Sequence, residues 1–188
     1  MTIRKLLFFL ISFLLFSCDG DTYGDATLYF IGDSQVANWD VEASFPNRIT
    51  KNLGKNGAKI GYLKSVKIYD NDATVIIELG TNDLGEYYDA DATDKYFTEY
   101  SKAIESIVGK RILLIEVLPT DDIDKNRNIV MFNALLEKKY KGNDKIKVVK
   151  VYDTMSRDGL IREDLTREGL HLNDYGYRIL TDKIQKAL

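Results

Sequence analysis

Cysteine and histidine are almost missing from this sequence. Its 188 residues include one of each, Cys18 and His171. One cysteine forms neither an intrachain disulfide nor a cysteine metal cluster, so a fold that depends on either is excluded. One histidine means that any mechanism with an imidazole base has to use His171.

An excess of positive charge is missing too. The chain has 26 Lys and Arg against 29 Asp and Glu, which gives a net charge of −3. A mixed, slightly acidic surface without a basic stripe argues against nucleic acid as a partner.

No hydrophobic run is long enough to cross a bilayer, which takes about 20 residues. The apolar run LLFFLISFLLF at residues 6–16 follows two basic residues, and this order predicts a secretory signal peptide over residues 1–17. Leu15–Cys18 resembles a bacterial lipobox, in which the cysteine is lipidated; the alternative is a plain signal peptide with a chance cysteine. We expect an exported lipoprotein, anchored through Cys18 on the periplasmic or cell-surface side, with residues 18–25 as the lipidated cysteine and a short tether.

The remaining 188 − 17 = 171 residues suffice for one domain, which we place at residues 26–188. Apolar stretches alternate with segments of helical periodicity, a pattern typical of a parallel sheet covered on both faces. The predicted fold class is α/β, a three-layer α/β/α sandwich. The predicted strands are Leu28–Ile31, a short one near Ile49–Asn52, Thr74–Leu79, Ile112–Leu118 and Ile146–Tyr152; the main helices are expected at 93–108, around 129–136, and from Asn173 or Asp174 to the end.

Ligands of such sheets bind beyond the carboxyl ends of the strands, so the loops there are where chemistry is expected. Four segments stand out. They are Gly32-Asp33-Ser34 after the first strand, Asn52 to Gly57 after the second, Gly80-Thr81-Asn82-Asp83 after the third, and Glu168-Gly169-Leu170-His171 before the last helix.

Together these segments contain the parts of a serine hydrolase. Ser34 is a candidate nucleophile and His171 its base, while Glu168, three residues earlier, can accept the imidazole Nδ1–H. The side-chain amide of Asn82 and the backbone N–H of Gly57 can donate to an oxyanion. Each residue also has a plain interpretation as a turn or surface residue, but independent turn residues have no reason to combine at four strand ends with the only histidine.

These residues resemble, in the right order, the four sequence blocks of the SGNH (GDSL) hydrolases, and the tail GLHLNDYGYRIL is similar to the family's final block. The resemblance covers nearly the whole chain after the signal region. It implies a flavodoxin-like five-stranded sheet, Ser34 as nucleophile and His171 as base. It also implies an oxyanion hole made by the Ser34 N–H, the Gly57 N–H and the Asn82 side chain, and neither a metal nor an organic cofactor.

The chain departs from the family pattern in two places. The family usually has aspartate three residues before the histidine, where this chain has Glu168. Glutamate serves as third member in other hydrolases, and Asp164 is the less favoured substitute. The connection after Ser34 is also short, which predicts an open site. Gly54 competes with Gly57 for the oxyanion position, and the spacing favours Gly57.

The substrate is expected to be a short acyl ester, especially an O-acetyl ester on a carbohydrate. Trp39, Tyr87 and Tyr88 fall in loops after the first and third strands, where aromatic faces can stack on sugar rings; their plain interpretation is core and loop packing. Two alternatives stay open: a lysophospholipase or lipase acting on long chains, and a lipoprotein that binds glycans without turnover. The oligomeric state is not predicted.

Overall fold

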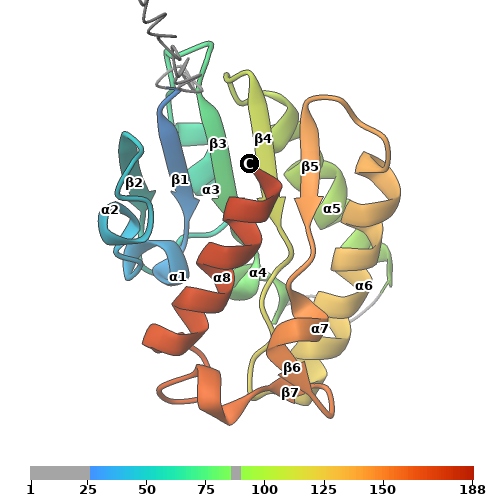
Figure 1. Ribbon diagram of the computed structural model, residues 1–188. Helices are drawn as coiled ribbons and strands as arrows, with labels where there is room; N and C mark the ends of the chain where they lie inside the picture. The colour runs from blue at the N-terminus through green and yellow to red at the C-terminus, as the bar shows by residue number, and fades with distance from the viewer. Residues whose placement is uncertain (1–25, 86–89) are drawn as a thin grey trace, which may run out of the picture.

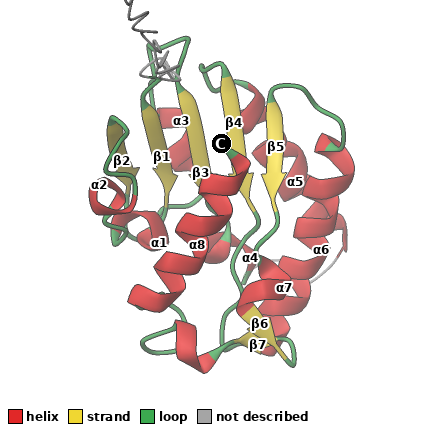
Figure 2. Cartoon of the chain, viewed as in Figure 1, coloured by secondary structure: helices red, strands yellow, loops and turns green. Residues whose placement is uncertain are grey.

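The computed structural model describes residues 26–85 and 90–188, which form a three-layer α/β/α sandwich (Figures 1 and 2). Its central sheet has five parallel strands in the order β2-β1-β3-β4-β5, the flavodoxin-like order. The strands are β1 (Leu28–Gly32), β2 (Thr50–Gly54), β3 (Thr74–Glu78), β4 (Arg111–Ile115) and β5 (Ile146–Val149). The predicted fold class and strand number are confirmed.

Two layers of helices cover the sheet. Helix α8 crosses one face of the sheet, and the short helices α1, α2 and α7 contribute to the same core. Helices α3, α5 and α6 cover the other face (Figure 1). A small hairpin, β6 (Ser156–Arg157) and β7 (Leu160–Ile161), was not predicted. The helices are α1 (Ser34–Ala37), α2 (Val41–Ser44), α3 (Gly61–Ser65), α4 (Thr81–Leu84), α5 (Ala90–Glu105), α6 (Ile123–Tyr140), α7 (Tyr152–Met155) and α8 (Asp174–Ala187), with a 3-10 turn at Glu163–Leu165.

Successive side chains of a buried strand pack alternately into the cores on the two faces of the sheet. In β3, Val75 and Ile77 pack into the core under α5 and α6, while Ile76 packs into the core under α8. All three are fully buried, which explains why these strands are apolar without polar alternation. Burying each such side chain contributes about 1.5–3 kcal/mol.

Three strands end earlier than predicted. β3 stops at Glu78, one residue before Leu79, while β4 stops at Ile115 rather than Leu118 and β5 at Val149 rather than Tyr152. Beyond β5, the Oε2 of Glu116 accepts the backbone N–H groups of Val151 (2.8 Å) and Tyr152 (2.9 Å). This carboxylate satisfies the N–H groups of the N-cap and the first residue of α7, where the chain has left the sheet.

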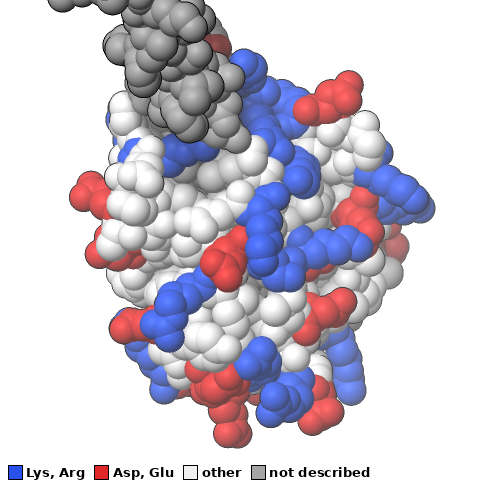
Figure 3. Space-filling model, in the orientation of Figure 1, with Lys and Arg blue, Asp and Glu red and all other residues white. Residues whose placement is uncertain are grey.

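The predicted signal peptide, Cys18 and the tether lie outside the described residues. Within the two described ranges, no helix is both long and apolar enough to cross a membrane. Lys, Arg, Asp and Glu are interspersed on the face that carries α8 (Figure 3).

Candidate active site

Ser34 lies directly beyond the carboxyl end of β1, as the first residue of α1. Asp33 caps this helix, because its Oδ1 accepts the backbone N–H of Gln35 at 2.9 Å. The backbone N–H of Ser34, in the first turn, has no acceptor within its own helix. The local sequence therefore places a half-buried serine at the first position of a helix, directly beyond the strand end.

His171 reaches Ser34 from the far end of the chain. Its Nε2 lies 2.9 Å from the Ser34 Oγ, although 137 residues separate the two in sequence. On the other side of the ring, Nδ1 is hydrogen-bonded to Glu168 Oε1, which also accepts the His171 backbone N–H at 3.2 Å. The structure thus brings together all three residues predicted from the sequence as a Ser-His-carboxylate set.

Glu168 holds the imidazole in a defined tautomer. Partial desolvation raises the pKa of Glu168, but the two hydrogen bonds from His171 and the charges of His171 and Arg167 lower it overall. An ionised carboxylate at Nδ1 keeps the proton on that nitrogen and leaves Nε2 free to accept the Ser34 proton. The side chains of His171 and Glu168 are 32% and 51% exposed, so this pair sits at an open surface.

Asp164 does not compete for His171. Its carboxylate is held by Arg162, with contacts of 2.6 and 3.1 Å. The hydrogen bond from Arg162 also lowers the pKa of Asp164. The structure therefore gives this acid a partner of its own.

Asn82, in α4, lies against the loop that contains Gly57. Its Nδ2 donates to Ala58 O at 3.1 Å and to Asp33 Oδ2 at 3.3 Å. The same loop is tied to β1, since Lys55 N–H donates to Gly32 O at 3.0 Å. The three predicted oxyanion donors are thus on segments that meet beside Ser34, but both hydrogens of the Asn82 amide already have acceptors. An oxyanion would have to replace one of them.

The two glycines of this region have different roles. A Cβ on Gly54 would lie 2.2 Å from Ala37 N, so Gly54 is needed for the close packing of β2 against α1. Gly57 has φ of +68°, in the left-handed region, and open space where a side chain would be. Of these two glycines, Gly57 is therefore the one with open space beside it.

A second acid lies beneath Asp33. Glu78, at the end of β3, is 0% exposed and neither of its oxygens has a hydrogen-bond partner among the described residues. Burial, and then the charge of Asp33, raise the pKa of Glu78 well above its usual value. Burial likewise raises the pKa of Asp33 from 3.8 to about 6, against the hydrogen bond from Gln35 and the attraction of His171. Because this folded pKa lies above the unfolded one, stability from Asp33 is full below pH 4 and is lost as the pH rises to about 6.

Sequence reasoning missed Glu78 as a neighbour of the site. The available signal was a charged residue inside the apolar strand TVIIE, where an acid is almost never fully buried without a reason.

The prediction that Trp39 lines the substrate site is wrong. Trp39 is 3% exposed and packs against Phe30, Phe45 and Tyr177, with ring centroids 5.2–5.9 Å apart. Its indole N–H donates to Ser44 Oγ at 2.9 Å. The ring is therefore part of the core and not an exposed stacking surface in a loop beside Ser34. Tyr87 and Tyr88 lie outside the described residues.

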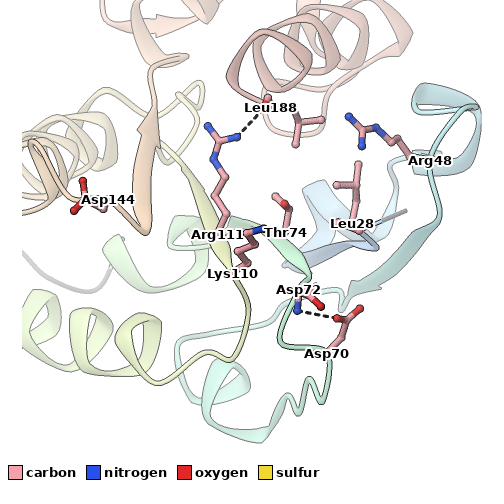
Figure 4. A pocket seen from close by; sticks show the side chains of 10 residues that line it. Leu28, Arg48, Asp70, Asp72, Thr74, Lys110, Arg111, Asp144 and Leu188 are labelled. Carbon is pink, nitrogen blue, oxygen red and sulfur yellow. Dashed lines mark hydrogen bonds between the residues drawn. The ribbon is translucent and has the colours of Figure 1, made fainter. Parts of the chain in front are cut away.

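The hollow in Figure 4 is remote from this site. It measures about 810 Å³ and lies among the first residues of β1, β3 and β4, Leu28, Thr74 and Arg111, at the amino edge of the sheet. Arg111 binds the carbonyls of Ala187 and Leu188 there, both at 2.6 Å. A smaller hollow of about 350 Å³ adjoins the His171 loop and is lined in part by Thr166, Arg167 and Gly169.

The sequence profile of the GDSL-like lipase/acylhydrolase family matches residues 30–179, which include Ser34, Asn82 and His171. The chain belongs to this family. It is therefore a hydrolase of carboxylic esters, and its SGNH-type fold agrees with this membership. A search of curated proteins finds no match.

Solved structures share the fold at low sequence identity. A Streptococcus pneumonia protein has a TM-score of 0.73 and 21% identity, with coverage of 89% of this chain and 86% of that one. A GDSL-like lipase from Bacteroides thetaiotaomicron has a TM-score of 0.69 and 24% identity, with 87% of each chain covered. A serine-to-alanine variant of an acetyl esterase, solved with acetate, has a TM-score of 0.59 and 14% identity, with coverage of 86% and 95%.

Proposed function

We propose that this esterase hydrolyses short-chain acyl esters, with O-acetyl groups on a carbohydrate as its substrate class. The observation that carries the proposal is the continuous contact from Ser34 Oγ through the His171 ring to Glu168, set at an open surface. This order of nucleophile, base and carboxylate is what acyl transfer from an ester to water requires.

In the proposed mechanism His171 Nε2 takes the Ser34 proton as Oγ attacks the ester carbonyl carbon. The carbonyl oxygen becomes an oxyanion, which the Ser34 N–H, the Gly57 N–H and the Asn82 amide stabilise. His171 then returns the proton to the leaving alcohol and an acyl-serine remains. In the second half His171 takes a proton from water, the hydroxyl oxygen bonds to the acyl carbon, and Ser34 recovers its proton as the acid leaves.

Two observations support a short acyl group. The His171 and Glu168 side chains are 32% and 51% exposed, and the connection after Ser34 is only the two four-residue helices α1 and α2. An exposed base with short flanking segments suits a small acyl group on a bulky, water-soluble alcohol better than a long chain that must be shielded from water. The acetyl esterase among the fold neighbours agrees with this choice.

The proposal is tested with p-nitrophenyl acetate, butyrate and octanoate near pH 8 and with acetate release from an acetylated glycan. We expect kcat/KM to fall as the acyl chain lengthens, and acetate to be released from the glycan. A rate that rises with chain length would instead indicate a lipase or lysophospholipase. Glycan binding with no hydrolysis of any ester would indicate a binding protein.

We also infer that the chain is anchored through Cys18 with its site directed away from the membrane. The described chain begins at Ala26, beside the amino edge of β1, whereas Ser34 follows the carboxyl edge, about 16 Å further along the strand. The expected result for Cys18→Ser is transfer of the protein from the membrane fraction to the soluble fraction on cell fractionation, with unchanged esterase activity. A variant that stays in the membrane fraction contradicts the anchor.

The charge of Glu168 is expected to matter more than its length. Glu168→Gln keeps the size but removes the negative charge that stabilises the imidazolium, so we expect kcat to fall by about 10²-fold, less than for a buried triad carboxylate. Glu168→Asp keeps the charge and should retain substantial activity. Both are measured as kcat on p-nitrophenyl acetate, and equal rates for wild type and Glu168→Gln would remove Glu168 from the mechanism.

A further inference from the structure

Gln35, the residue after Ser34, is buried and uses every polar atom it has. It is 2% exposed. Its backbone N–H donates to Asp33 Oδ1 at 2.9 Å, and its carbonyl accepts the Tyr177 hydroxyl at 2.8 Å. Its side-chain Nε2 donates to Leu170 O at 2.7 Å, and its Oε1 accepts Leu172 N–H at 3.3 Å. The side chain thus bonds to the backbone on both sides of His171.

The segment that carries the base, residues 166–172, needs such a contact. It is closed on itself by the bridge between Thr166 and Leu172 and by bonds from Arg167 N–H and Thr166 Oγ1 to His171 O, both at 2.9 Å. These bonds fix the shape of the segment but not its place relative to Ser34. A further bond, from Asp121 N–H to Gly169 O at 2.9 Å, ties the segment to the residues just before α6 and does not involve the turn of Ser34.

We propose that Gln35 is a positioning residue that clamps the segment of His171 onto the turn of Ser34, and so sets the distance from base to nucleophile. The proposal rests on the esterase function above. The backbone of Gln35 moves with Ser34, because the two are adjacent, and its side chain moves with His171. One carboxamide therefore joins two catalytic residues that are 137 positions apart.

The two side-chain contacts of Gln35 require a carboxamide. It must donate to one carbonyl and accept from one N–H about two residues further on, and a neutral amide does both at once without burying a charge. A leucine would fill the volume and leave Leu170 O and Leu172 N–H without these partners, and a carboxylate would place negative charge against Leu170 O.

The test compares Gln35→Leu with Asn133→Leu. Asn133 is 5% exposed and also uses both ends of its amide, accepting the Val117 N–H at 2.9 Å and donating to Val117 O at 3.0 Å; these two side-chain bonds involve neither Ser34 nor the His171 segment. We expect Gln35→Leu to lower kcat by about 10- to 100-fold with KM changed less than about twofold, because misplacing a reacting group by about 1 Å has such an effect. Asn133→Leu should keep the wild-type kcat, whatever it does to thermal stability.

Gln35→Glu supplies a second variant of nearly the same shape. At pH 8 its carboxylate cannot donate to Leu170 O, whereas in its protonated form it can. Burial raises the pKa of a carboxyl group, so this form gains as the pH falls. We expect the ratio of its kcat to that of wild type to rise as the pH is lowered from 8 to about 6. A constant ratio is the result of a purely steric role and overturns the clamp.

The single histidine gives a readout that needs no turnover. In protein made without a histidine tag, every imidazole NMR signal belongs to His171. We expect these signals to shift or broaden in Gln35→Leu and to stay unchanged in Asn133→Leu. Unchanged signals in Gln35→Leu, or equal changes in both variants, overturn the proposal. If wild type hydrolyses no ester, the proposed function fails while this comparison still decides the clamp.

Discussion

Replacing Ser34 with alanine is expected to lower kcat/KM on p-nitrophenyl acetate by at least about 10³-fold, since no acyl-serine can form without the hydroxyl. The residual rate would come from binding and from the oxyanion donors, which the substitution leaves in place. Ser34 is the first residue of α1, and Asp33 caps this helix by accepting the Gln35 N–H. The Ser34 side chain takes no part in the cap, so alanine preserves the turn. The measurement is steady-state kinetics with the unfolding temperature recorded alongside.

The matched control is Ser65→Ala. Ser65 is likewise a serine at a helix end, here the last residue of α3, and its Oγ donates to Tyr62 O at 2.7 Å and not to a residue of the proposed site. It should keep the full rate. A fluorophosphonate should label wild type and Ser65→Ala with one adduct per chain and leave Ser34→Ala unlabelled. Turnover by Ser34→Ala near the wild-type rate would mean that another group is the nucleophile.

The sheet could be predicted because its signals are local. A run such as TVIIEL has to be buried on both sides, and Gly-Asp-Ser or Gly-Thr-Asn-Asp directly after such a run marks the carboxyl end of a strand. What local signals did not fix was the end of β4 and β5. After β5, Val151 N–H bonds to the Glu116 carboxylate across 35 residues of sequence, and nothing next to Val151 indicates this contact.

The candidate site could likewise be predicted where its signals are local, and not where they depend on tertiary contacts. Ser34, His171 and Glu168 could be paired because the chain has one histidine and an acid three residues before it. Gln35 and Trp39 could not be assigned, because their roles depend on which way the short α1 turns. With the observed turn, the Trp39 ring packs against Phe30 and Tyr177, and the Gln35 amide bonds to the His171 segment. Side-chain direction after a short connection is a tertiary property.

The buried acids near Ser34 give the site an internal constraint. Asp33 Oδ2 accepts from Asn82 while its Oδ1 accepts from Gln35 N–H in the turn of Ser34, so one carboxylate joins the proposed nucleophile to the proposed oxyanion donor. Glu78, which pairs with Gly32 across β3 and β1, is fully buried, and burial and the charge of Asp33 raise its pKa. One acceptor of the Asn82 amide is therefore the carboxylate that also caps the helix of Ser34.

Replacing Asn82 with alanine is expected to lower kcat by about 10²- to 10³-fold, the usual effect of losing one oxyanion donor. Asn82 Nδ2 is bonded to Ala58 O at 3.1 Å and to Asp33 Oδ2 at 3.3 Å, both longer than the usual 2.9–3.0 Å. A short, charge-assisted bond to an oxyanion is stronger than either, so the developing charge can draw one N–H away from its present acceptor. The loss should therefore appear in kcat, with KM nearly unchanged.

Two further variants distinguish donation to the oxyanion by Asn82 from a role in holding α4 in position. Asn82→Asp keeps the shape but has no donor, so it should lose as much activity as alanine. Asn128→Ala removes a bond that holds α4 from the other side, since Asn128 Nδ2 donates to Leu84 O at 3.0 Å. If α4 only had to be held in place, Asn128→Ala would lower kcat as Asn82→Ala does. We expect it to lower the unfolding temperature and leave kcat within about threefold of wild type, because in the proposed mechanism the Asn82 donor itself stabilises the transition-state oxyanion.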